Sequence, residues 1–94
     1  MEHAKIQLKN KQADGYVIPA GPFNLVAILT DVGMVGCGAF DVRAVDRFNY
    51  PAAKISGVAT LDDLLNGRVK EVNEHAAARG LRAGMTGREA AELL

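Results

Sequence analysis

The stretch from Gly15 to Phe40 contains a single charged residue, Asp31, in a chain of which 23% is charged. Its turn-forming residues are Pro19, Gly21, Pro22 and Gly33. Short uncharged runs between prolines and glycines are typical of buried strands joined by turns. This stretch therefore predicts the buried part of a sheet, built largely from the first half of the chain.

Four strands are expected before Asp41. They span Ala4–Leu8, Tyr16–Ala20, Phe23–Leu29 and Met34–Phe40, with a turn at Asp14-Gly15 after the first. The first strand alternates between apolar and polar residues, as a half-buried strand does. The third is apolar on both faces, so we expect it either between two layers or against another subunit. The fourth is expected to pair with the third in the antiparallel sense.

The second half of the chain is expected to be mainly helical, with one further strand, Ala52–Ala59. The expected helices span Val42–Phe48, Thr60–Asn66, Val69–Arg79 and Thr86–Leu94. Asp41 is the expected N-cap of the first, capping boxes begin the second and fourth, and Gly80 ends the third. Strands followed by helices indicate an α+β fold, here a mostly antiparallel sheet of about five strands with roughly three to four short helices.

Length and charge limit the classes of partner. The chain has 94 residues, which predicts one domain over residues 1–94, and its 11 basic and 11 acidic side chains cancel. General nucleic-acid binders need a basic excess, so no nucleic-acid partner is expected. No apolar run reaches the length of a membrane helix and the N-terminus has no apolar signal segment, so we expect a cytoplasmic protein without a membrane partner. With one cysteine and two distant histidines, neither a disulfide nor a metal site is expected.

Apolar content is high for so short a chain. Hydrophobic residues make up 49% of it and there are 10 glycines besides, which together exceed the roughly 45–50% of an average soluble domain. A domain of this size buries a small share of its surface. A homo-oligomer that hides an apolar face is therefore expected, and the alternative is a monomer with an alanine- and glycine-rich surface.

Three positions are candidates for a binding or catalytic role. Cys37 lies between two glycines, four residues before the expected helix at Asp41. It is either a reactive or ligand-contacting thiol, with its pKa lowered by that helix, or a buried small hydrophobe. Lys54 interrupts an apolar strand, where it would bind an anion, pair with Asp41, or protect a sheet edge. Arg88 follows a glycine-flanked helix start that would offer N–H groups to an anion, unless the helix is simply capped. His75 is expected on the surface.

Three stretches of the chain resemble the DUF1805 family of YunC-like bacterial and archaeal proteins. They are Cys37–Val42, Gly57–Leu65 and Gly80–Ala90, the last being the most specific. With their order and spacing, the match covers nearly all of the chain from Gly15 onward. The resemblance implies a stand-alone α+β domain that is oligomeric and cytosolic, and it implies no activity or catalytic residue. Cys37, Asp41, Thr60 and Arg88 lie within the matching stretches, whereas His3 and His75 do not.

Two kinds of function follow from these observations, although the sequence names no substrate and no cofactor. The main hypothesis is a non-catalytic, oligomeric binding or interaction domain. In one form of this hypothesis, a pocket for a small anionic ligand is lined by Cys37, Asp41, Lys54 and Arg88. In the other form, the function depends on an apolar interface with another protein chain. The alternative is a thiol-dependent enzyme with Cys37 as nucleophile, activated by Lys54 or by a helix N-terminus. Whether the protein is an enzyme stays open at this point.

Overall fold

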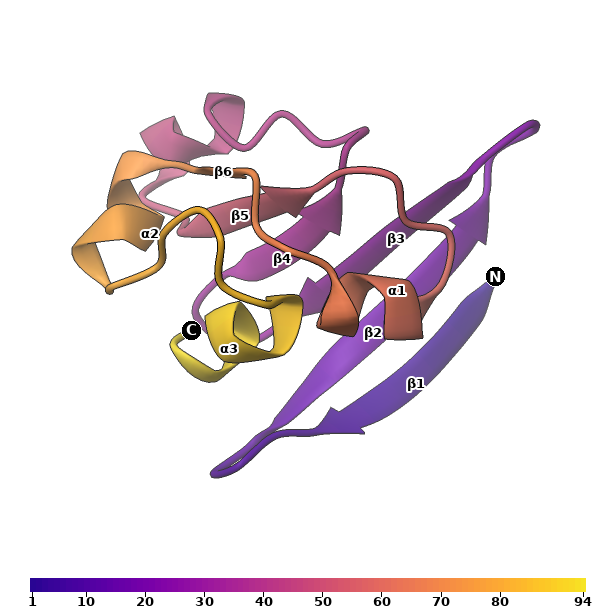
Figure 1. Cartoon of the computed structure of the whole chain (residues 1–94), viewed down its shortest axis with the longest axis horizontal. Helices are drawn as coiled ribbons and strands as arrows, with labels where there is room; N and C mark the ends of the chain where they lie inside the picture. The colour runs from indigo at the N-terminus through magenta and orange to yellow at the C-terminus, as the bar shows by residue number, and fades with distance from the viewer.

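Six strands form one sheet in their order along the chain, in a computed structural model that describes all 94 residues (Figure 1). The strands are β1 (Glu2–Gln7), β2 (Gln12–Pro19), β3 (Asn24–Leu29), β4 (Met34–Cys37), β5 (Ala52–Ile55) and β6 (Glu71–Val72). Neighbouring strands are antiparallel except β4 and β5, which are parallel. A parallel pair needs a crossover connection, and residues 38–51 provide it.

Helices cover one face of the sheet and the crossover covers part of the other. The helices are α1 (Leu61–Asn66), α2 (Glu74–Ala78) and α3 (Gly87–Glu92), and the crossover contains a 3-10 helix, η1 (Ala44–Phe48). Figure 1 shows α1 and α3 in front of the sheet. We call this side the helix face, and the opposite side the open face. The α+β class, with its helices mainly in the C-terminal half, is confirmed.

Each face of the sheet contributes to a separate core. Val26, Ile28 and Val35 point to the helix face and belong to a main core of 18 buried residues. Ala27, Met34 and Ala52 point the other way and, with Val42 of the crossover, form a second core of 4 buried residues. The third strand is therefore central between two layers, as its two apolar faces predict.

The capping boxes of α1 and α3 and the glycine after α2 are confirmed, whereas the N-cap of η1 is Arg43 and not the expected Asp41, because the helical turn begins two residues later. The side chains of Thr60 and Thr86 each accept a hydrogen bond from the residue three positions on, and both capping boxes are complete. Gly80 follows α2 with a φ of 95°, the left-handed conformation that favours glycine at this position. The antiparallel pairing of β3 with β4 is also as expected.

The expected turn at Asp14-Gly15 is wrong. Both residues lie inside β2, and the chain instead turns after Leu8, whose N–H donates to the carbonyl of Lys11 at 2.8 Å. A Cβ on Gly15 would lie 2.8 Å from side-chain carbons of Ile6 and Leu61. Gly15 thus allows close packing beneath α1. A sequence pattern cannot distinguish such a packing glycine from a glycine in a turn.

The expected helix Val69–Arg79 is also corrected. Its first part is extended: β6 pairs with β5, and α2 begins after Asn73, whose side chain caps it. The expected helix Val42–Phe48 is a shorter 3-10 helix, and the strands Met34–Phe40 and Ala52–Ala59 end early, at Cys37 and Ile55. None of the helices is long and apolar enough to span a membrane.

Candidate functional site

The thiol of Cys37 lies in the main core. Its side chain is on the helix face and the residue is 4% exposed. Its sulfur accepts a hydrogen bond from the N–H of Val26 at 3.5 Å. Gly36 and Gly38 do not expose this thiol: a Cβ on Gly36 would lie 2.6 Å from the ring of Phe40, which packs against the opposite face of the strand. The packing interpretation of the glycine-flanked cysteine fits this geometry.

We therefore expect the Cys37 thiol of the folded protein to react with a disulfide reagent about 100-fold more slowly than in the unfolded chain, because the core must open first. Thiol labelling followed by absorbance, with and without urea, measures both rates. The protein needs no substitution for this test, since Cys37 is its single cysteine. A native rate equal to that of a free thiol would show that the sulfur is accessible.

Lys54 lies on the open face, where it forms an ion pair. Its Nζ is 3.0 Å from Oε1 of Glu71, and Arg43 from the crossover binds the other oxygen of the same carboxylate. Hydrogen bonds from Arg43 and then Lys54 hold the pKa of Glu71 below its usual range. Lys54 does not protect a sheet edge, since β5 has neighbours on both sides. It joins β5, β6 and the crossover instead.

The remaining two candidates have local partners. The carboxylate of Asp41 accepts a hydrogen bond from the N–H of Ala44 at 3.1 Å, at the start of the 3-10 turn. Arg88 donates from Nη1 to the carbonyl of Gln7 at 3.1 Å, joining α3 to the end of β1. Cys37, Asp41, Lys54 and Arg88 therefore do not converge, and the shared pocket expected around Cys37 is not formed. The reason is the pleat: Cys37 and Lys54 occupy opposite faces of the sheet.

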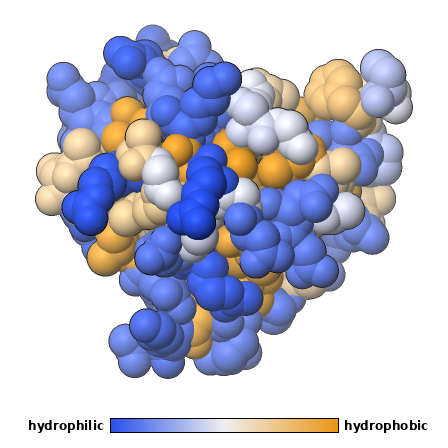
Figure 2. Space-filling view, viewed as in Figure 1, coloured by the Kyte–Doolittle hydropathy of each residue, from blue (hydrophilic) through white to orange (hydrophobic).

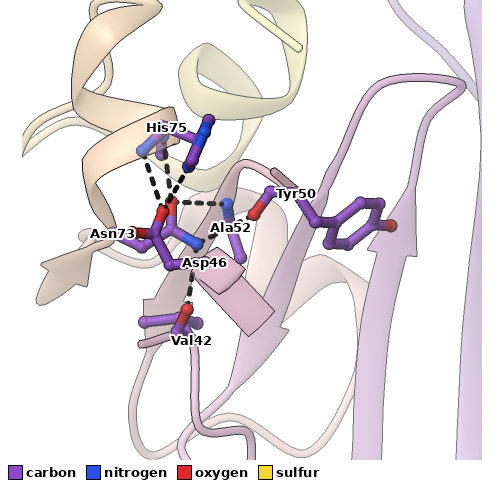
Figure 3. A network of polar contacts seen from close by, with 7 residues as sticks. Val42, Asp46, Tyr50, Ala52, Asn73 and His75 are labelled. Carbon is purple, nitrogen blue, oxygen red and sulfur yellow. Dashed lines mark hydrogen bonds and ion pairs between the residues drawn. The ribbon is translucent and has the colours of Figure 1, made fainter. Parts of the chain in front are cut away.

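A buried amide that sequence reasoning missed fixes the crossover (Figure 3). The side chain of Asn73 accepts from the N–H groups of Ala52 and Ala76, and it donates to the carbonyls of Val42 and Tyr50. Asn73 is 4% exposed, and these four bonds satisfy its amide. One side chain thus joins β5, α2 and both ends of the segment that carries η1.

The same region contains a histidine–aspartate pair. Nδ1 of His75 lies 2.6 Å from Oδ1 of Asp46, and the backbone N–H of His75 donates to the same oxygen at 3.1 Å (Figure 3). The side-chain hydrogen bond from His75 is the main cause that lowers the pKa of Asp46. Their separation of 29 residues gave no sequence signal. No group of three or more His, Cys, Asp or Glu side chains is placed to hold a metal ion.

The open face of the sheet is the most distinctive surface of the molecule. Over β1, β2 and β3 no helix covers it, and the crossover reaches β3, β4 and β5. Its apolar side chains are Tyr16, Ile18, Leu25 and Leu29, placed by the register of β2 and β3. Ile18 is 40% exposed, and Phe23 in the adjoining turn is 52% exposed. An apolar sheet surface is thus accessible to solvent beside the second core.

Polar residues border this apolar surface on the β1 side. The ring of His3 stacks on that of Tyr16, with centroids 4.7 Å apart and an interplanar angle of 7°. The carboxylate of Asp14 accepts from Nε2 of His3 at 2.9 Å and from Nζ of Lys5 at 2.6 Å. Both hydrogen bonds lower the pKa of Asp14, and the one from Lys5 has the larger effect. The open face thus has an apolar middle between two charged groups, this one and the Arg43–Glu71–Lys54 cluster.

The comparisons with known proteins agree with this fold. The chain is 35% identical over 71 residues to the "Uncharacterized protein YunC" of Bacillus subtilis (strain 168), and the match covers 71% of this chain and 70% of that protein. It superposes on the crystal structure of a protein of unknown function, TA1206 from Thermoplasma acidophilum, with a TM-score of 0.91 and 24% sequence identity. That superposition covers 97% of this chain and 89% of the other, and it shows that the two share a fold.

The family model that matches is described as "Domain of unknown function (DUF1805)", and the match covers residues 36–94. It includes the three stretches that suggest the family from sequence. The first stretch spans the end of β4 and the start of the crossover. The second leads into α1 and the third leads into α3, and each includes most of its helix. Neither the family nor these relatives has an assigned activity. The chain belongs to the DUF1805 family.

Proposed function

We propose that this protein is a small non-catalytic interaction domain that assembles with a second copy of itself through the open face of its sheet. The observation that carries the proposal is the apolar surface over β2 and the adjoining part of β3, which neither the helices nor the crossover cover. Figure 2 shows the helix face, where hydrophilic residues form most of the surface. On the open face, Ile18 and Phe23 are both exposed beside the second core, and adjoining exposed apolar residues are typical of an associating surface.

The size of the surface fits a homodimer. The molecule measures 33 by 28 Å in the view of Figure 1, so the whole open face, with the crossover and the charged groups included, can offer roughly the 800 Å² that each partner buries in a stable complex. A two-fold axis would place the same patch on both sides, with the apolar middle at the centre and charged groups toward the margin. Two sheets packed face to face would then bury Ile18 and Leu25 of each copy.

Introducing a charge at Ile18 tests this surface. We expect the wild-type chain of 10.0 kDa to behave as a dimer in light scattering, and Ile18→Lys to weaken dimerisation by at least about tenfold, because the lysine would be buried against its own copy. Leu93→Lys is the matched control: Leu93 lies at the end of α3 on the other side, and it is 41% exposed against 40% for Ile18.

A wild-type monomer at roughly 100 µM would overturn the proposed dimer, since stable homodimers form well below that concentration. So would equal weakening by Ile18→Lys and Leu93→Lys, because the contact would then not be confined to the open face. Circular dichroism of both variants checks that each is folded.

We further propose that the protein works in the cytoplasm. The support is its single cysteine, which is buried in the main core without a disulfide partner, as is usual where thiols stay reduced. Fractionation of cells that express a tagged chain tests this proposal, and recovery from a membrane or secreted fraction would contradict it.

A further inference from the structure

A cavity lies between the β1–β2 turn and α3, away from the open face. Its volume is about 330 Å³, which is near the lower end of ligand pockets, at roughly 300–1,000 Å³. The turn that forms one wall extends past α3 in Figure 1. This cavity contains none of the four site residues expected from sequence.

The two walls of the cavity are held in place by hydrogen bonds. Arg88, at the start of α3, donates to the carbonyl of Gln7 at 3.1 Å and so ties the helix to the end of β1. The turn is closed by the bond from the N–H of Leu8 to the carbonyl of Lys11, at 2.8 Å. The cavity therefore lies between two positioned elements, and it is not formed by one mobile loop.

The two walls carry opposite charges. The turn contributes Lys9 and Lys11, and the α3 wall contributes Glu89 and Glu92. Neither lysine forms an ion pair with a carboxylate, and Glu92 forms none with a base. One oxygen of Glu89 accepts from the N–H of Thr86 at 2.8 Å, and this backbone bond is the main cause that lowers the pKa of Glu89. The two walls thus present basic and acidic groups that face the cavity without ion-pair partners.

Apolar side chains also line the cavity. They belong to Leu8, Met85 and Leu93; Leu93 is 41% exposed, whereas Leu8 is part of the main core. An exposed leucine beside unpaired charges leaves both kinds of group available to a ligand. The ligand that fits has a carboxylate for the lysines, an ammonium group for the glutamates, and an aliphatic part for the apolar surface.

We propose that this cavity binds a small zwitterion with an aliphatic side chain, the chemical class of the free branched-chain amino acids. The inference does not depend on the dimer, because the cavity is lined by the β1–β2 turn and by α3 with its flanking residues, whereas the dimer would form through the open face. A ligand of this size would bind in the millimolar range.

The test uses L-leucine and two analogues that each lack one charge, 4-methylpentanoate and isoamylamine. Amide NMR spectra of the full chain are recorded as each compound is added up to about 20 mM. We expect L-leucine to give saturable shifts at residues 8–11 and 85–93. Each analogue should bind at least about tenfold more weakly, because a charge-assisted hydrogen bond is lost.

Two variants show whether the walls supply these contacts. Lys11→Gln and Glu92→Gln should each weaken leucine binding about tenfold, whereas Lys70→Gln and Glu74→Gln, outside the cavity, should leave it unchanged. Glu89 is left intact because it completes the cap of α3. The proposal is overturned if leucine gives no saturable shift, if an analogue binds equally well, or if the wall and control variants behave alike.

Discussion

Replacing Gly87 with alanine is expected to destabilise the protein by about 3 kcal/mol, at the upper end of the usual cost of overpacking. Gly87 is the first residue of α3, and a Cβ there would lie 1.9 Å from the carbonyl oxygen of Leu64 in α1. The oxygen belongs to the backbone, so no side-chain rotation relieves the clash. The two helices would have to move apart over the main core.

The sign of this effect distinguishes packing from helix propensity. Gly87 does not have a positive φ, and alanine is the better helix former by about 1 kcal/mol. Propensity alone would therefore predict a stabilised protein. Urea unfolding measures the difference, and thermal unfolding should show Tm lower by roughly 10–20 °C for a domain of this size.

Gly38→Ala is the matched control. A Cβ at Gly38 would lie 3.3 Å from the flexible hydroxyl of Ser56 and 3.6 Å from its Cα. We expect a change within about 1 kcal/mol of zero there, because the hydroxyl can rotate and the unfolded chain loses entropy. Equal stability losses in the Gly38 and Gly87 variants would show that the close approach of α1 to α3 is not the cause.

Short-range chemistry explains which parts of this fold could be predicted. The capping boxes at Thr60 and Thr86 satisfy N–H groups with side chains three residues away, so the sequence pattern contains the whole interaction. The pairing of β3 with β4 depends on a tight turn at Gly33, which is equally local. Such features do not depend on the rest of the fold.

Long-range contacts explain the failures. Val69, Val72 and Ala76 have helical spacing, but residues 70–73 instead extend the sheet: Lys70 and Asn73 donate their N–H groups to carbonyls of β5. The helix α2 can therefore begin only after Asn73, where the hydrogen bonds to β5 end. At Asp14-Gly15, the pairing of β2 with both neighbours overrides a dipeptide that favours turns. Tertiary pairing outweighs local propensity in both segments.

The candidate site was harder to predict than the fold. Local sequence context points to the four residues expected to form a pocket, but it does not determine on which side of the sheet each of them lies. In the register of β4 and β5, Cys37 pairs with Ile55 on the helix face, and Lys54 pairs with Gly36 on the open face. An error of one residue in placing either strand would move its side chains to the opposite face. The open face itself depends on where the crossover ends, and no local pattern encodes that.

Replacing Asn73 with leucine is expected to cost about 4 kcal/mol, because four backbone groups, three of them in buried hydrogen bonds, lose their partner at roughly 1–3 kcal/mol each, partly offset by relaxation. That loss approaches the whole stability of a typical small domain, at about 5–15 kcal/mol. Urea unfolding measures it. Asn66→Leu is the control, since Asn66 is exposed at the end of α1. Equal losses at the two positions would contradict the role assigned to the buried amide.

Asn73→Asp separates the capping bonds from those that hold the crossover. The aspartate keeps the oxygen that accepts from Ala52 and Ala76, but it places a second oxygen against the carbonyls of Val42 and Tyr50. Burial and these carbonyls favour the protonated acid, so its pKa rises in the folded state above the roughly 3.9 of the unfolded chain. The unfolded chain then releases its proton first, and the stability of the variant relative to wild type should fall as pH rises from about 4 to 7. Unfolding curves for both proteins across this range test the sign; a difference that does not change with pH would show that the crossover carbonyls have turned away from residue 73 and no longer depend on it.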